Sequence, residues 1–135
     1  MHRHNRDTII IAILLFCLLI AAGIIGRSYV VARADTNGPC EAALGRSTAP
    51  LAEGIVESCS SPYWHWGATR SDRVIFYNPT KIRRAGNSAA LWDYVVAHER
   101  CHAQSLVAGR GDWMNERLAD DCASQYADVR FSPYR

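Results

Sequence analysis

The segment His98-Glu99-Arg100-Cys101-His102 constrains the fold of this chain more than any other stretch. In an α-helix, residues i and i+4 lie on the same face, because 3.6 residues complete one turn. The two histidines can therefore present their imidazole rings to one tetrahedral metal ion, with Glu99 beside the metal rather than on it. The segment predicts a zinc site on a helix, with a carboxylate placed to act as a general base.

The residues around this segment have the pattern of a helix. Residues 89–97 contain neither glycine nor proline, and apolar side chains continue the stripe of the two histidines at helical spacing. Asn87 or Ser88 can cap the start of this helix, and Gly109 is expected to end it.

A second helix is expected to begin at about Trp113, with Asp112 as its cap. On that helix Glu116 and Asp120 share one face, because they are four residues apart. A carboxylate from Glu116 would complete a three-ligand site that leaves the fourth position for water. Asp120 could accept a hydrogen bond from a ligating histidine and fix its tautomer. The sequence thus predicts one zinc ion per chain, held by His98, His102 and Glu116.

Together, H-E-x-x-H and the E-x-x-x-D pattern of residues 116–120 resemble the signature of gluzincin metallopeptidases, in particular of the CAAX-prenyl-protease type. The resemblance covers about residues 91–126, roughly a quarter of the chain. It implies a small zincin-like domain, in which a short sheet accompanies two zinc-bearing helices. The resemblance implies that His98, His102 and Glu116 bind zinc and that Glu99 is the general base. It also implies that Asp120 supports a zinc-binding histidine through a hydrogen bond.

Near the N-terminus, residues 8–26 form an uncharged, largely apolar stretch of nineteen positions. As a helix it would span roughly 28 Å, about the thickness of a bilayer core. Residues 1–7 are basic and are expected to stay in the cytoplasm. Two interpretations stay open: a transmembrane anchor, which the length favours, or a signal peptide cleaved at Ala32-Arg33-Ala34. Both place the C-terminal part outside the cytoplasm, either membrane-anchored or secreted.

The distribution of charge gives no reason to expect a nucleic-acid partner. The chain has a net charge of +2, but residues 1–34 hold four arginines against one aspartate. From Asp35 onward, eleven Lys and Arg face twelve Asp and Glu. The positive charge therefore belongs to the targeting segment, and the expected partners are a membrane and a peptide or protein substrate.

Four of the five cysteines are expected to form disulfides, because they lie in a short exported domain. Three pairings are possible, and pairing between neighbours in the sequence favours Cys40 with Cys59 and Cys101 with Cys122. The second bond would join the two metal-bearing helices. As an alternative, Cys101 or Cys122 could itself be a zinc ligand.

The rest of the chain is less informative. Residues 27–39 are expected to be a linker, and residues 40–135 a single domain of the α+β class. A short helix is expected over residues 51–57, and strands over residues 63–66 and 73–77, joined by a turn. By the resemblance, Val74–Tyr77 is the candidate edge strand on which a peptide substrate could add. Further candidates are Tyr63, His65, Tyr77 and Tyr126 as oxyanion donors, and Lys81, Arg83 and Arg84 as a solvated basic cluster in a loop.

Two functions fit these observations. The first is a zinc-dependent peptidase, in which Glu99 takes a proton from a metal-activated water. The second is a non-catalytic, zinc-stabilised and membrane-anchored binding module, since a metal site can stabilise a small fold by itself. Glu99 discriminates between them, because a structural zinc site needs no base at that position.

Overall fold

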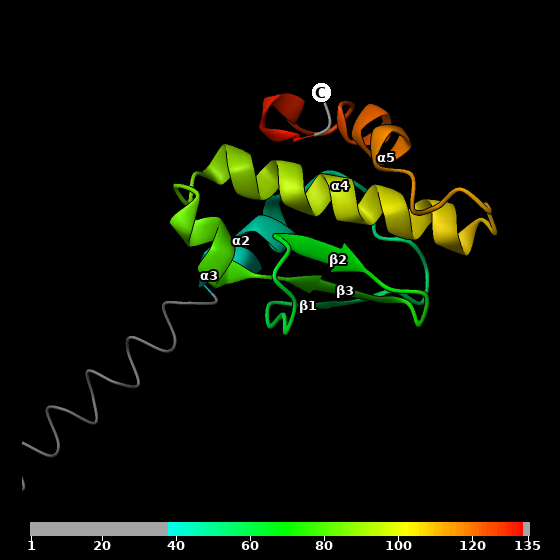
Figure 1. Ribbon diagram of the computed structural model, residues 1–135, viewed down its shortest axis with the longest axis horizontal. Coiled ribbons are helices and arrows are strands. Elements are labelled where there is room, and N and C mark those ends of the chain that lie inside the picture. The colour runs from blue at the N-terminus through cyan, green and yellow to red at the C-terminus, as the bar shows by residue number, and fades with distance from the viewer. Residues whose placement is uncertain (1–37, 134–135) are drawn as a thin grey trace, which may run out of the picture. The chain divides into compact units, whose positions relative to one another are not determined.

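The computed structural model describes residues 38–133, which form an α+β domain (Figure 1). Three short strands, β1 (Val56–Ser58), β2 (Gly67–Thr69) and β3 (Val74–Tyr77), make one sheet in the order β1-β3-β2. The α+β class expected from the sequence is confirmed. The helices are α2 (Gly38–Arg46), α3 (Pro79–Arg84), α4 (Ala89–Val107) and α5 (Glu116–Ala123), followed by a 3₁₀ turn, η1 (Val129–Phe131).

The expected targeting segments, residues 1–7 and 8–26, and most of the linker 27–39 lie outside the described residues. Within residues 38–133, no helix is both long and apolar enough to cross a bilayer. The last two residues of the expected linker are helical, because α2 already begins at Gly38. Pro39 is compatible with this start, since the first turn of a helix does not need its N–H groups for intrahelical bonds.

Helix α4 is enclosed by the rest of the domain. It runs across one face of the sheet, while α5 and η1 cover its opposite side (Figure 1). Residues 91, 92 and 94–103 of α4 are all buried, so the helix has no long solvent-facing stripe. Its ends confirm the sequence analysis: the Ser88 side chain accepts the Leu91 N–H, and Gly109 follows the helix with a φ of 69°.

A buried ion pair holds α4 against β1. The guanidinium of Arg100 donates through Nε and Nη2 to the two carboxylate oxygens of Glu57, each at 2.9 Å. It also donates to the backbone carbonyls of Ala49 and Leu44, and the Tyr77 hydroxyl donates to Glu57 at 2.8 Å. A planar guanidinium with several donors suits such a site, where each buried polar atom needs a partner. Nothing in the sequence pattern indicated a role for Arg100 or Glu57.

Strand β3 is in the centre of the sheet, so the expected role of Val74–Tyr77 as an edge strand is wrong. β1 pairs with it in parallel and β2 pairs with it antiparallel. The edge that approaches α4 is β2, in the segment that was expected to be a turn. The expected strand over residues 63–66 is also wrong: Asn78 binds the carbonyls of Tyr63 and Trp66, which draws this segment to the end of β3 and away from the sheet ladder.

The helix expected over residues 51–57 does not form. Glu53 and Gly54 make a turn, with Gly54 at a φ of 74°, a conformation that favours glycine. The Val56 N–H then donates to the Arg73 carbonyl, and β1 begins. The apolar spacing was compatible with a helix, but the pairing of β1 with β3 decides the structure.

Two disulfides join elements of the domain. Cys40 of α2 bonds Cys59, one residue after β1, and Cys101 of α4 bonds Cys122 of α5; each Cα–Cα distance is 6.0 Å. These are the two pairs that the sequence analysis favoured, and they are compatible with an exported protein. Each closes a loop of about twenty residues, for which the loss of unfolded-chain entropy contributes about 3 kcal/mol.

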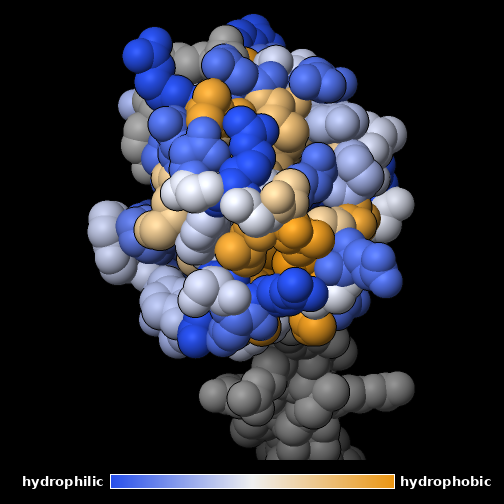
Figure 2. Space-filling view, turned by 90° about the vertical axis from the view of Figure 1, so that its right-hand side faces the viewer, coloured by the Kyte–Doolittle hydropathy of each residue, from blue (hydrophilic) through white to orange (hydrophobic). Residues whose placement is uncertain are grey.

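Some large apolar side chains remain on the surface. On the side of the molecule at the C-terminal end of α4, apolar surface gathers near the middle and hydrophilic side chains surround it (Figure 2). Such exposure is common in small domains, which have too little polar surface to cover themselves. The exposed large apolar residues among those described are Leu51, Val56, Trp64, Met114 and Leu118.

We expect Glu57→Ala to lower the free energy of unfolding by about 3–5 kcal/mol, because it leaves the Arg100 guanidinium buried without a counter-charge. Urea unfolding of the oxidised full chain measures this loss. Asp93→Ala is the matched control, since it removes the carboxylate of the exposed Arg46–Asp93 pair and should cost at most about 1 kcal/mol. Equal losses in the two variants would show that the buried pair has no special weight.

Candidate metal centre

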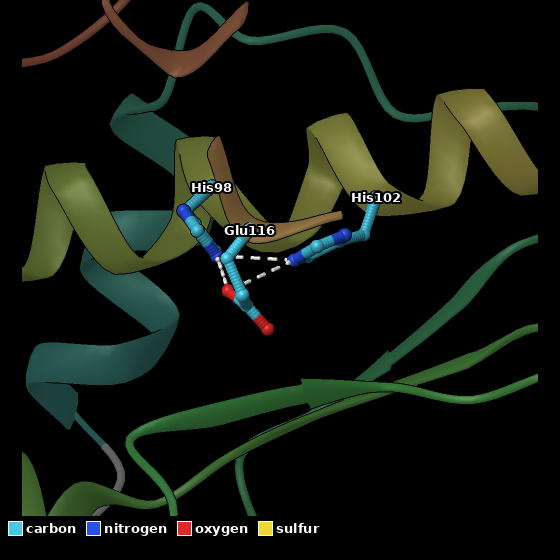
Figure 3. Close-up of side chains that lie close together, drawn as sticks. All are labelled: His98, His102 and Glu116. Atoms are coloured by element: carbon cyan, nitrogen blue, oxygen red, sulfur yellow. Dashed lines mark hydrogen bonds and ion pairs between the residues drawn. The ribbon is translucent and has the colours of Figure 1, made fainter. Parts of the chain in front are cut away.

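Two helices bring three potential metal ligands together. His98 and His102 come from the middle of α4, and Glu116 is the first residue of α5 (Figure 3). Their candidate ligand atoms all lie within 4.8 Å of one another. The two Nε2 atoms are 3.0 Å apart, and Glu116 Oε2 lies 2.9 Å from Nε2 of His98 and 3.4 Å from that of His102. The three residues that the sequence singled out thus form a group that could hold a metal ion.

The outer nitrogens of both imidazoles have acceptor partners. Nδ1 of His98 lies 2.8 Å from Oδ1 of Asp120, and Nδ1 of His102 lies 2.6 Å from the carbonyl oxygen of Trp113. A backbone carbonyl or a carboxylate can only accept here, so each Nδ1 carries a proton, and each Nε2 is left to donate to Glu116 when protonated or to offer its lone pair to a metal ion. Three acceptor atoms therefore converge on one point, and this donor set fits a divalent cation such as zinc.

Asp120 is held from three sides. It is almost fully buried, and its Oδ1 accepts from the Tyr94 hydroxyl at 3.1 Å as well as from His98. Its Oδ2 accepts a short hydrogen bond from the Ser132 hydroxyl, which follows η1. The expected contact of Asp120 with a histidine of the pair is therefore present. Tyr94 and Ser132 were missed, although Tyr94 lies four residues before His98 and so on the same helical stripe.

The electrostatics of the group favour positive charge at its centre. Burial lowers the pKa of His98, but the hydrogen bond to Glu116, the charge of Glu99 and the hydrogen bond to Asp120 together raise it above its ordinary value. Hydrogen bonds with His102 and His98 lower the pKa of Glu116 to about 2. The carboxylate of Glu116 is therefore ionised at neutral pH, as a metal ligand must be.

The start of α5 differs from the expectation. Asn115, not Asp112, caps the helix, and its side-chain oxygen accepts the N–H groups of Arg117 and Leu118. The residues just before Asn115 form turns instead of a helix, and this conformation lets the Trp113 carbonyl reach His102. The later start still leaves Glu116 and Asp120 on one face of α5.

Glu99 lies beside the ligand group but is not part of it. Its side chain is buried at the edge of β2, where the Thr69 hydroxyl lies 2.8 Å from Oε2 and 2.9 Å from the backbone carbonyl of Glu99. Within residues 38–133, no hydrogen-bond donor to Oε1 is found, so one carboxylate oxygen is open to accept a proton. A Cβ at Gly67 would lie 2.6 Å from Glu99 Cγ, so only glycine lets β2 approach so closely.

An open cleft of about 470 Å³ joins these groups. One wall is α4 with the two histidines and Glu99, and the facing wall is the edge strand β2 with the residues that precede it. Much of the remaining lining is aromatic, contributed by Trp64, Trp66, Tyr94 and Trp113. A cleft with a few convergent polar groups and mostly apolar walls is typical of a ligand-binding site.

Several candidates from the sequence do not join the group. Cys101 and Cys122 are bonded to each other, which excludes the alternative that either is a metal ligand. Tyr77 is fully buried with its hydroxyl on Glu57, so its expected role as an oxyanion donor is wrong. His65 does line the cleft, where its exposed ring stacks on Trp64. Neither Tyr63 nor Tyr126 is part of the described cleft lining.

Comparison of the chain with protein-family models, with curated proteins and with solved structures finds no match. The interpretation of the site therefore depends on its own geometry.

We expect the full chain to bind one zinc ion, and His98→Ala or Glu116→Ala to lose most of it, because each removes one of three ligands. Metal analysis after dialysis measures the occupancy. His65→Ala is the matched control, since this histidine lines the same cleft outside the ligand group. Asp120→Asn should weaken zinc affinity about 10–100-fold by loosening His98. Full occupancy in Glu116→Ala would mean that another carboxylate is the third ligand.

We expect Gly67→Ala to lower the free energy of unfolding by about 1–3 kcal/mol and to displace Glu99, because the added methyl group overlaps that side chain. Urea unfolding measures the loss, and zinc content should stay unchanged because the ligands lie elsewhere. Gly111→Ala, where nothing lies within 4 Å of the added Cβ, should be close to neutral. A Gly67→Ala protein as stable as the wild type would contradict the close packing of Glu99 on β2.

Proposed function

We propose that this protein is a zinc-dependent peptidase of the gluzincin type, with His98, His102 and Glu116 as metal ligands and Glu99 as general base. One observation carries the proposal: a glutamate lies on the cleft wall beside the ligand group without belonging to it. A site that only stabilises the fold gains nothing from such a carboxylate, whereas hydrolysis requires a proton acceptor next to the metal.

In the proposed reaction, bound zinc supplies a Lewis acid that polarises the substrate carbonyl and makes water more acidic. Glu99 accepts the proton of the attacking water through its open Oε1, while Thr69 holds Oε2. The water oxygen bonds to the carbonyl carbon, the C–N bond breaks, and Glu99 returns the proton to the leaving amine. The products are a carboxylic acid, which loses its proton to water at neutral pH, and an amine.

The strand β2 is the proposed docking site for the substrate backbone. It is an edge of the sheet and it lines the cleft opposite α4. An extended peptide can add to such an edge through main-chain hydrogen bonds, which would place a carbonyl between β2 and the ligand group. This replaces β3, the strand first expected to have this role.

The alternative function is a membrane-anchored binding module, in which zinc only stabilises the fold. The observation that favours it is the position of the ligand group, which links α4 to α5 just as the Cys101–Cys122 disulfide does. The two disulfides suit an exported domain under either function. We further propose that residues 8–26 anchor the domain outside the cytoplasm.

We expect Glu99→Gln to retain zinc and the fold but to lower peptide hydrolysis about 10²–10⁴-fold. Glutamine keeps the size and can still accept from Thr69, but it cannot take a proton at neutral pH. Cleavage of a broad peptide library by the zinc-loaded full chain, followed by mass spectrometry, measures this. Glu53→Gln, which changes an exposed glutamate, is the control and should have full activity.

Two outcomes would contradict the proposal. If the zinc-loaded wild type cleaves nothing in the library, the binding module becomes the better account. If Glu99→Gln and the wild type cleave equally well, Glu99 is not the base.

A further inference from the structure

One lysine lies in the wall of the cleft. Lys81, on α3, is the only Lys or Arg that lines the cleft among residues 38–133, and its side chain is half-buried. Its neighbours Arg83 and Arg84 are exposed and do not line it. The expected loop is wrong because all three residues lie on α3, and the expected solvation is wrong for Lys81.

The ammonium group of Lys81 is held in place without being neutralised. Its Nζ lies 4.6 Å from the centre of the Trp64 ring, a cation–π contact, and Trp64 in turn stacks on His65. The Asn78 side chain accepts the Lys81 N–H and donates to the Tyr63 carbonyl, so the base of the lysine is fixed as well. In the described part of the chain, no carboxylate forms an ion pair with Lys81.

Lys81 is the positively charged side chain in the lining of the cleft, among the described residues. The two carboxylates in the lining are those of Glu99 and Glu116, and the charge of a divalent ion on the ligand group would offset both. The ammonium of Lys81 is then the positive side-chain charge that borders the cleft, while the carboxylate of Asp120 lies behind His98 and outside the lining. A ligand carboxylate would be attracted to this place and would find a donor there.

The geometry points to Lys81 as a specificity-determining residue that selects peptides with a carboxylate close to the bond that is cleaved. The inference rests on the proposed peptidase function. The carboxylate could come from the C-terminus of the substrate or from an Asp or Glu side chain. Both present the same chemistry to the ammonium group, and the experiment separates them.

The test uses the zinc-loaded full chain in detergent and N-acetylated peptide pools in matched pairs. One pair differs only in a C-terminal carboxylate or amide, and the other only in a Glu or Gln placed at each position in turn. We expect kcat/KM to be about tenfold higher for the carboxylate-bearing member of at least one pair. The pair that shows the preference identifies the source of the carboxylate.

Variants of the basic residues assign the preference. Lys81→Met keeps most of the unbranched stem of the side chain but not its charge, and it should abolish the preference while leaving cleavage of the uncharged peptides within about twofold. Lys81→Arg should retain most of the preference. Arg84→Met, which removes an equal charge from the same helix outside the cleft, should retain all of it. A preference that survives in Lys81→Met, or no preference in the wild type, overturns the inference and leaves the peptidase function standing.

A measurement of peptide binding tests the role of Lys81 independently of the proposed peptidase function. Equilibrium binding of the same peptides to zinc-loaded Glu99→Gln protein, with and without Lys81→Met, needs no hydrolysis. If no protein cleaves any pool but carboxylate-bearing peptides bind about tenfold more tightly through Lys81, the peptidase proposal fails and the role of Lys81 stands. Equal binding of both members of each pair would overturn the role of Lys81.

Discussion

The enclosure of α4 is the constraint on which the rest of the domain depends. A helix that is buried continuously from Tyr94 to Ala103 cannot leave a polar side chain without a partner, yet it carries His98, Glu99, Arg100 and His102 there. Each finds its partner in a different place: α5 for His98, β2 for Glu99, β1 for Arg100, and the turn before α5 for His102. In the described part of the chain, no buried side-chain polar atom lacks a hydrogen bond. The elements around α4 are thus fixed in position by the polar groups that they satisfy.

The contact between α4 and α5 is reinforced by links of different kinds. The disulfide from Cys101 is covalent, the ligand group brings in Glu116, and Asp120 binds His98 through a buried hydrogen bond. A domain of about a hundred residues has a small core, and disulfides or metals commonly supplement such cores. The disulfide lies one residue from His102, so it limits how far α5 can separate from the ligands even when no metal is bound. The disulfide therefore keeps α5 close to the residues that could hold a metal ion.

The proposed base and the proposed ligands are held from opposite sides of α4. The ligands depend on α5, whereas Glu99 depends on β2, where Thr69 fixes one of its carboxylate oxygens and Gly67 gives it room. A substitution of Glu99 can therefore remove proton transfer without removing the metal ligands. Such a substitution should abolish the activity of a peptidase but leave a binding module unaffected. Strand β2 would also receive the substrate backbone, so the position of Glu99 and the position of the substrate are set by the same three residues.

The sequence by itself determined those features of the structure that depend on the spacing of residues close together in the chain. Two histidines four residues apart, a serine cap and a following glycine define α4 and its ligand face, and the order of the cysteines favoured the disulfides that form. Tertiary structure alone decided that β2 is the edge strand that lines the cleft, that Arg100 is buried, and that Lys81 lies in the cleft wall. The physical reason is that strands of three or four residues carry almost no periodic signal, so their pairing is set by partners far along the chain. The same holds for Glu57 and Arg100, which meet across 43 positions because each supplies the counter-charge that the other needs when buried.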